Sequence, residues 1–373
     1  MNNFETCVVL NLISGIGYIR FKALCEKFGS ADSILNAKYK DLINIGNIGT
    51  KLAEKIVNWE KTVDLEKELN LIKKSGVKVL TICDDKYPYQ LKETPDPPLC
   101  LYIRGELKAE FSNSIAVVGS RRITSYGREM TQFLTSSLAY AGWHIVSGLA
   151  YGVDAAAHQA TIDSSGITTA VLGGGLARLH PQDNISLARN IIEKGGAVIS
   201  EFPMELSPTR RTFPMRNRVI SGLCCGVLVI EAGVKSGSLI TAGCALEQGR
   251  MVFAVPGRAN SPLSKGCNKL IKDGAILTEN LDDILKEFEF LPGILSCINK
   301  SNDSIVNTNS ISDKLVFTAE ENLILECLEL EEKNIDTISV ETELPIGKLL
   351  ALLVKLEMRK VIKQIPGKRF KMS

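Results

Sequence analysis

The spacing of apolar residues changes along this chain, and each pattern predicts a different kind of structure. Residues 1–65 show helical spacing interrupted by two glycine-containing turns, at residues 14–17 and 46–49. Two helices joined by a glycine-rich hairpin, present twice, fit this spacing, so we predict an N-terminal helical domain of the helix-hairpin-helix or SAM-like kind. Such hairpins either direct backbone N–H groups toward a phosphate or act only as compact packing units, and the pattern leaves both open.

Residues 66–288 alternate short Val- and Ile-rich runs with stretches of helical periodicity, such as 126–141 and 239–248. Near-continuous apolar strands separated by helices are typical of a parallel sheet covered on both faces. We therefore expect the α/β class, with a Rossmann-like, doubly wound and mainly parallel sheet. The predicted strands are residues 77–82, 115–118, 144–147, 168–172, 197–200, 226–230, 251–255 and 275–277.

The last part of the chain has a third pattern. Residues 289–312 lose periodicity and are rich in Asn, Ser and Asp, which predicts a flexible linker. In residues 313–373, helices at 318–330 and 345–360 and a hairpin at 361–372 together indicate a winged helix. On the second helix Lys348, Lys355 and Arg359 share one face, which is either a nucleic-acid contact or a solvated surface.

Composition limits where a partner could bind. With 44 Lys and Arg against 42 Asp and Glu the net charge is only +2, so any site for a polyanion must be local. The ten cysteines include no CxxC pair, and we expect reduced thiols without zinc or disulfides. There is no apolar run of membrane-spanning length and no signal-peptide pattern, so we expect a cytoplasmic protein without a membrane span.

Unusual residues gather where the predicted strands end, which is the edge at which open parallel sheets bind ligands. Glycines there allow close approach to the backbone, and arginines donate paired hydrogen bonds to phosphate. We predict a phosphate-binding crevice with base stacking on Phe213 or Tyr126. Its residues are Gly119, Ser120, Arg121, Arg122, Gly148, Gly174, Arg216, Asn217, Arg218, Ser236, Gly237 and Ser238. The alternative is that Arg216 or Arg218 pairs with Glu201 or Glu231 inside the fold.

No catalytic or metal-binding pattern accompanies this crevice. Residues 119–124 do not form GxGxxG, because Arg121 stands where a second glycine should admit a pyrophosphate, and the chain has no P-loop. The three histidines lack metal-ligand spacing, and His158, on an apolar helix, is interpreted as structural. We therefore expect no cofactor, no metal and no enzyme activity.

An ordered set of short blocks carries a resemblance to a known family. The blocks read GSR at 119–121, SGL at 147–149, RNRVI at 216–220, SGSLIT at 236–241 and VPG at 255–257. In this order they resemble the DNA-processing protein A (DprA, or Smf) family. The resemblance implies a recombination mediator that binds and protects single-stranded DNA entering by natural transformation, helps to load the RecA recombinase, and dimerises through its Rossmann-like domain. It also implies that Gly119, Ser120 and Arg121 hold a backbone phosphate.

Two positions depart from that family's pattern. Tyr151 stands where a basic residue is usual, and Gln182 lies in a loop where relatives have a nearby lysine, so one implied DNA-contacting charge is missing. Two other functions remain as hypotheses. A nucleotide phosphoribohydrolase-type enzyme carries a loop ending in Gly-Thr-x-x-Glu, which residues 231–241 lack. A regulator that binds duplex DNA through the winged helix would lose duplex binding on deletion of residues 313–373.

Overall fold

The computed structural model describes residues 2–107, 111–288 and parts of the chain between 319 and 372. Contacts divide the chain into two compact units, Met1–Ser304 and Ile305–Ser373. The predicted linker at residues 289–312 lies outside the described residues. Among the residues that are described, no helix is both long enough and apolar enough to cross a membrane.

Short helices form the N-terminal region, as predicted. Its two glycine-containing turns are joined by Arg20, whose guanidinium donates to the carbonyl oxygens of Gly15 and of Asn47, the latter at 2.9 Å. Both of these turn residues have left-handed backbone angles, with φ of 104° at Gly15 and 69° at Asn47. The helices are α1 (Asn3–Leu12), α2 (Tyr18–Phe28), α3 (Ala31–Ile34), α4 (Tyr39–Ile43), α5 (Thr50–Val57), α6 (Trp59–Thr62) and α7 (Leu65–Lys74).

A nine-stranded sheet follows, with the strand order β1-β2-β6-β5-β4-β3-β7-β8-β9. Every neighbouring pair from β6 to β9 is parallel, whereas β1 and β2 are antiparallel additions at one edge. The Rossmann-like α/β prediction is therefore confirmed. The strands are β1 (Lys78–Thr81), β2 (Cys100–Gly105), β3 (Ser114–Val118), β4 (His144–Ser147), β5 (Thr168–Val171), β6 (Ala197–Ser200), β7 (Gly226–Val229), β8 (Met251–Ala254) and β9 (Ile276–Leu277).

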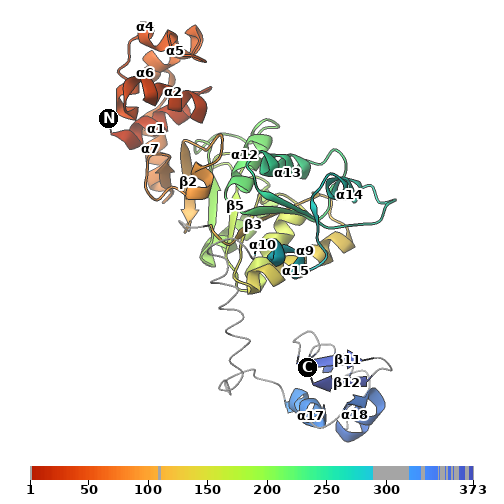
Figure 1. Ribbon diagram of the computed structural model, residues 1–373. Coiled ribbons are helices and arrows are strands. Elements are labelled where there is room, and N and C mark those ends of the chain that lie inside the picture. The colour runs from red at the N-terminus through yellow and green to blue at the C-terminus, as the bar shows by residue number, and fades with distance from the viewer. Residues whose placement is uncertain are drawn as a thin grey trace. The chain divides into compact units, whose positions relative to one another are not determined.

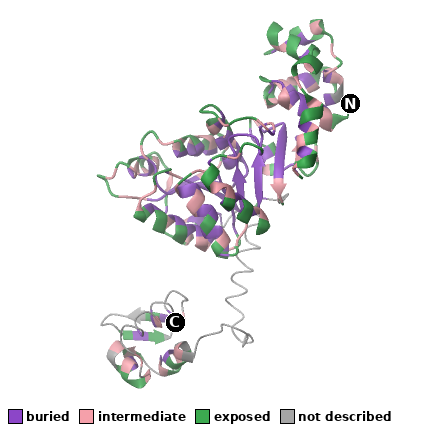
Figure 2. Cartoon of the chain, turned by 180° about the vertical axis from the view of Figure 1, so that it is seen from behind, coloured by how far each residue is buried: buried purple, intermediate pink, exposed green. Residues whose placement is uncertain are grey.

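Both faces of the sheet are buried, and alternating side chains of the central strand β3 pack on the two faces in turn. Ile115 and Val117 of β3 pack in the cluster that includes α9 and α15 residues, whereas Ala116 and Val118 pack in the cluster that includes α12 and α13 residues. Figure 1 shows these helices on opposite sides of the sheet, and Figure 2 shows buried strands beneath helices with exposed outer surfaces. The helices of this region are α8 (Tyr89–Lys92), α9 (Ser125–Tyr140), α10 (Val153–Asp163), α11 (Ile185–Glu193), α12 (Thr212–Gly222), α13 (Ser238–Glu247), α14 (Lys265–Lys272) and α15 (Leu281–Phe288).

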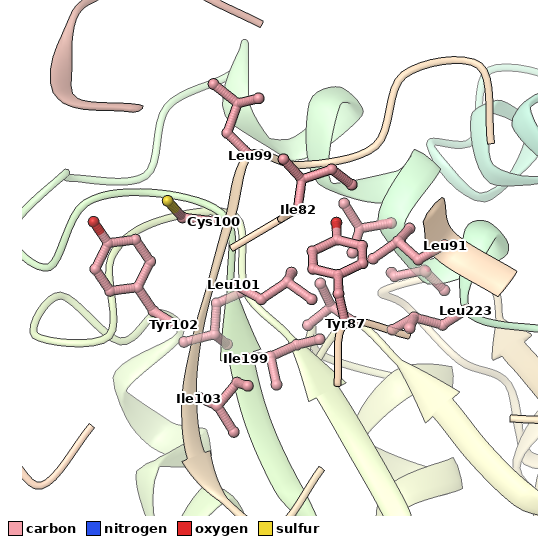
Figure 3. Close-up of a cluster of buried hydrophobic side chains, with 14 of the residues drawn as sticks. Ile82, Tyr87, Leu91, Leu99, Cys100, Leu101, Tyr102, Ile103, Ile199 and Leu223 are labelled. Carbon is pink, nitrogen blue, oxygen red and sulfur yellow. The ribbon is translucent and has the colours of Figure 1, made fainter. Parts of the chain in front are cut away.

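Strand β2 was not predicted from the sequence. It lies between β1 and β6, and its residues Cys100, Leu101 and Tyr102 are completely buried. Figure 3 shows Tyr102 on one side of this strand and Leu101 on the other, next to Ile199 of β6. The strand directly follows a segment that contains Pro95, Pro97 and Pro98. Strand β2 is extended because it pairs with β6, which is distant in the sequence.

The C-terminal unit contains α17 (Ala319–Leu328), α18 (Ile335–Thr342) and a three-stranded sheet in the order β10-β12-β11. Its strands are β10 (Lys333–Asn334), β11 (Ile362–Ile365) and β12 (Arg369–Met372). The predicted hairpin is confirmed, with Ile362 paired to Met372, and buried residues such as Ile324 and Phe370 form a separate core. Lys348, Lys355 and Arg359 lie outside the described residues.

Candidate nucleic-acid interface

The order of the strands opens a crevice next to β3. From β3 the chain crosses to β4 on one side, and it later returns to pair with β3 on the other side as β7. Loops that leave β3 and β7 therefore diverge, which is where open α/β sheets bind ligands. A cleft of about 450 Å³ lies at this point. The predicted residues that line it are Gly119, Ser120, Arg121, Arg122, Phe213, Arg216, Asn217, Ser236, Gly237 and Ser238.

The loop after β3 is held by Glu231, two residues after the end of β7. The Ser120 N–H donates to the Glu231 carbonyl oxygen at 2.7 Å. The Thr124 N–H and hydroxyl donate to the Glu231 carboxylate at 2.9 and 2.5 Å. Glu231 is buried, so it acts as an anchor of the loop, and it leaves Arg121 and Arg122 exposed at the rim of the cleft.

Two glycines are required by close packing around this loop. Gly152, which precedes α10, has φ of 78°, and a Cβ there would lie 2.2 Å from the carbonyl oxygen of Ser120. At Gly148 a Cβ would lie 2.4 Å from Nη1 of Arg216. The glycines after β4 therefore allow the loop after β3 and the Arg216 guanidinium to come close. Packing inside the protein thus explains both glycines without a contact to a ligand.

Arg216 forms part of the floor of the cleft. It is 4% exposed, and its Nη1 donates to the carbonyl oxygens of Gly148, at 2.6 Å, and of Val171. Its Nε has no hydrogen-bond partner among the described residues. Burial lowers the pKa of Arg216 to about 10, and burial raises the pKa of Asp154 although Arg216 opposes that change. Arg216 is thus a fixed buried cation, which attracts an anion without moving toward it.

Arg218 differs from the prediction, because its side chain does not line the cleft. Its guanidinium, 18% exposed, forms an ion pair with the buried carboxylate of Glu201 and also contacts Asp96, with Nε 3.3 Å from the Asp96 carboxylate. The alternative in which an arginine of this helix pairs with Glu201 is therefore confirmed for Arg218. The physical reason is that residues two apart on a helix point in directions about 200° apart, so Arg216 and Arg218 cannot share one cleft.

Gly174 and Tyr126 are also placed differently from the prediction. Gly174 faces Leu206 and Pro208, and its carbonyl oxygen accepts a hydrogen bond from Ser200 at 2.8 Å. Tyr126 donates its hydroxyl to the Pro256 carbonyl oxygen at 2.7 Å and lines a separate hollow. Phe213 does line the cleft, but the Arg121 guanidinium lies over its ring, 5.1 Å from the centroid.

Models of two protein families match this chain. One is described as DNA recombination-mediator protein A and matches residues 78–289, and the other, described as DprA winged helix domain, matches residues 314–368. Protein Smf of Escherichia coli (strain K12) is 41% identical over 281 residues, which is 75% of this chain and 74% of that protein. The chain belongs to the DprA/Smf family.

Solved structures of DprA proteins agree with this assignment. The X-ray structure of DprA from Streptococcus pneumoniae has a TM-score of 0.65 and 34% identity, and the match covers 76% of this chain and 98% of that one. A DprA structure from Helicobacter pylori, at 28% identity and a TM-score of 0.51, covers 60% of this chain and 96% of its own. That structure is described as giving insight into how the Helicobacter pylori protein binds single-stranded DNA.

Two cations near the cleft, Lys235 and Arg128, were missed by the sequence prediction, and Tyr151 was noted only as a departure from the family pattern. Lys235 lines the cleft and is exposed. Arg128 and Tyr151 line an adjoining hollow of about 650 Å³, which shares Arg121 and Arg122 with the cleft. Tyr151 is 44% exposed, and its hydroxyl donates to Asp183 at 2.7 Å. Lys235 lies directly before the predicted residues 236–238, whereas Arg128 is a helix residue whose position follows only from the fold.

Proposed function

We propose that this chain binds single-stranded DNA in the cleft between the loop after β3 and the first turn of α13. The observation that carries the proposal is a set of cations around one hollow: exposed Arg121, Arg122 and Lys235 at its rim and buried Arg216 in its floor. Guanidinium groups and helix N-termini are the groups that bind phosphates in proteins. The Helicobacter pylori relative, whose described ligand is single-stranded DNA, supports the same ligand here.

We propose that the chain binds the DNA strand and catalyses no reaction on it. Two carboxyl groups beside the cleft are used by the fold, since Asp154 accepts the Gly148 N–H at 3.2 Å and Glu231 accepts the Thr124 N–H at 2.9 Å. His158 is fully buried, its Nδ1 lies 2.7 Å from the Thr168 hydroxyl, and burial lowers its pKa to about 3. Asp154, Glu231 and His158 therefore hold neighbouring groups in position, and we assign none of them to acid–base catalysis.

Membership of the DprA/Smf family extends the proposal to a cellular role. We infer that the chain acts in the cytoplasm as a recombination mediator, protecting single-stranded DNA in natural transformation and helping to load RecA onto it. We also propose that it works as a homodimer through the Rossmann-like domain. The support for these roles is the match to a family model described as a DNA recombination mediator.

Arg121 provides the direct test of the cleft. Arg121→Ala should weaken binding of a fluorescently labelled oligothymidylate by about tenfold to a hundredfold, because it removes a charge-assisted hydrogen bond to phosphate. The slope of log affinity against log salt should also fall by about 0.7, the value for one phosphate contact on a single strand. Fluorescence anisotropy at several salt concentrations measures both quantities. Arg189→Ala, at an exposed position on α11 outside both hollows, is the control, and equal affinities for the two variants would refute the proposed site.

Tyr151 is proposed to stack on a base of the bound strand. Its half-exposed ring is held by the bond to Asp183 next to Arg121 and Arg122, and stacking on an aromatic ring is a common contact for single strands. Tyr151→Ala should weaken oligothymidylate binding by about tenfold while leaving the salt slope unchanged, because no cation is lost. Tyr151→Phe keeps the ring and should bind nearly as well as the original protein. Equal binding by the alanine variant and the original protein would exclude stacking at this position.

A further inference from the structure

Two cysteines meet where the N-terminal helices contact the sheet. Cys7 lies on α1 and is fully buried, whereas Cys83 is exposed in the turn that follows β1. Their sulfur atoms are 4.0 Å apart and share a hydrogen bond. Cys25 and Cys100 lie near enough to influence the pKa of Cys7. The group therefore joins thiols from two helices, one turn and one strand, and it is separate from the DNA-binding cleft.

The turn that carries Cys83 is held by its own hydrogen bonds. The Asp84 carboxylate accepts the Thr81 N–H at 2.6 Å and the Thr81 hydroxyl at 2.9 Å. The Tyr87 N–H donates to the Asp84 carbonyl oxygen at 3.1 Å. These bonds hold the backbone of the turn on the C-terminal side of Cys83.

Two further hydrogen bonds fasten the N-terminal helices to the sheet domain. Asn11 of α1 donates to the Glu201 carbonyl oxygen at 3.1 Å, and Glu68 of α7 accepts the Met204 N–H at 2.8 Å. Both contacts involve the segment directly after β6. The two thiols are thus carried by elements that remain in contact, which favours a bond between them over a bond to another chain.

The two thiols differ in how easily they ionise. The hydrogen bond from Cys7 lowers the pKa of Cys83, and Cys83 is also the exposed thiol of the two, so it is the one that ionises more readily. The same hydrogen bond and burial raise the pKa of Cys7. Because the thiolate is the reactive form, Cys83 has the properties of the attacking group and Cys7 those of the second, resolving thiol.

We propose that Cys83 and Cys7 are an oxidation-sensitive pair that a hydroperoxide converts to a disulfide, joining α1 to the turn after β1. The Cys83 thiolate attacks the terminal hydroxyl oxygen of the hydroperoxide, the O–O bond breaks, and a sulfenic acid forms while the other oxygen leaves as hydroxide (from hydrogen peroxide) or alkoxide. The Cys7 sulfur then attacks the Cys83 sulfur, and the sulfenic hydroxyl leaves as water with the Cys7 proton. Each sulfur loses one electron and the peroxide takes both.

This bond needs only a local rearrangement. The sulfur atoms must move from 4.0 Å apart to the disulfide length of about 2.05 Å, a change that side-chain rotation and a small shift of the turn can supply. The bond would close a loop between residues 76 positions apart in sequence, which restricts the unfolded chain. Reversible bonds of this kind are compatible with a reducing compartment, where disulfides are usually transient and act in redox sensing.

The test uses the full chain exposed to hydrogen peroxide, followed by thiol blocking and mass spectrometry of non-reduced peptides. We expect one linked pair, Cys7 with Cys83, about 2 Da lighter than the two free peptides, lost again on treatment with dithiothreitol. The thermal unfolding midpoint of the oxidised protein should rise by several degrees. A link from Cys83 to Cys25 or Cys100, a link between two chains, or a sulfinic acid at Cys83 as the main product would overturn the proposal.

Two variants separate this pair from general oxidation. Cys83→Ser changes an exposed side chain, so the protein should fold normally and should lose both the linked peptides and the rise in midpoint. Cys25→Ser changes a half-buried thiol of the same group and should keep both effects. A midpoint that still rises in Cys83→Ser, or a link that disappears in Cys25→Ser, would also count against the assignment.

Discussion

Replacing Arg218 by alanine is expected to lower the free energy of unfolding by about 3–5 kcal/mol, because it leaves a buried carboxylate without its partner. Arg218 pairs with Glu201, whose side chain is only 8% exposed, and it also reaches Asp96 from the segment between β1 and β2. Arg218 pairs with Oε2 of Glu201, and the other carboxylate oxygen, Oε1, has no hydrogen-bond partner among the described residues. Urea unfolding followed by circular dichroism measures the loss.

The size of this loss should depend on pH. Burial already raises the pKa of Glu201 to about 7, and removing Arg218 takes away the main group that opposes this rise. Without Arg218 the folded protein holds a protonated Glu201 at little cost at pH 5, whereas at pH 8 it must either bury the charge or keep a proton that the unfolded chain has released. Arg218→Ala should therefore be more destabilised, relative to the original protein, at pH 8 than at pH 5.

A matched control for this variant is the exposed ion pair between Lys67 and Glu205. Its atoms are 2.6 Å apart, but the two side chains are 59% and 39% exposed. Exposed pairs contribute little because water and salt screen them. Lys67→Ala should leave the urea midpoint almost unchanged. A similar loss in Lys67→Ala and Arg218→Ala would mean that burial does not determine the strength of these pairs.

Gly152→Ala is expected to cost about 2–5 kcal/mol of stability and to weaken DNA binding as well. A left-handed backbone costs a residue with a Cβ roughly 1–2 kcal/mol, and relief of a close contact adds about 1–3 kcal/mol. The new Cβ would lie 2.2 Å from the Ser120 carbonyl oxygen, so the loop that carries Arg121 must move. Thermal unfolding and anisotropy with oligothymidylate measure the two effects.

Gly237 provides the control for this second variant. It lies in the same cleft, but its φ is −63° and a Cβ there would meet no atom within 4 Å. Gly237→Ala should therefore change stability by no more than roughly 0.5 kcal/mol. If Gly152→Ala is as stable as Gly237→Ala, the backbone at Gly152 does not hold the loop in the way described.

The positions of the cleft residues show which parts of a site follow from local sequence. Gly119, Ser120 and Arg121 come directly after β3, and residues 236–238 lie where the loop after β7 meets α13. Parallel strands end at the same edge of the sheet. Their gathering in one cleft was therefore predictable. Tyr151 was recognised only as a departure from the family pattern, because its exposure and its bond to Asp183 depend on how two loops meet.

From the sequence alone we could determine the doubly wound sheet, the family and the strand ends that carry the site, since periodicity and glycine-rich turns are local properties. Only the tertiary structure decided between Arg216 and Arg218. Both lie on α12, but Arg216 packs against Gly148, 68 residues away, whereas Arg218 meets Glu201 and Asp96, which is 122 residues away. The side of a helix that is buried depends on what packs against it, so contacts between distant segments determined which cation faces the cleft.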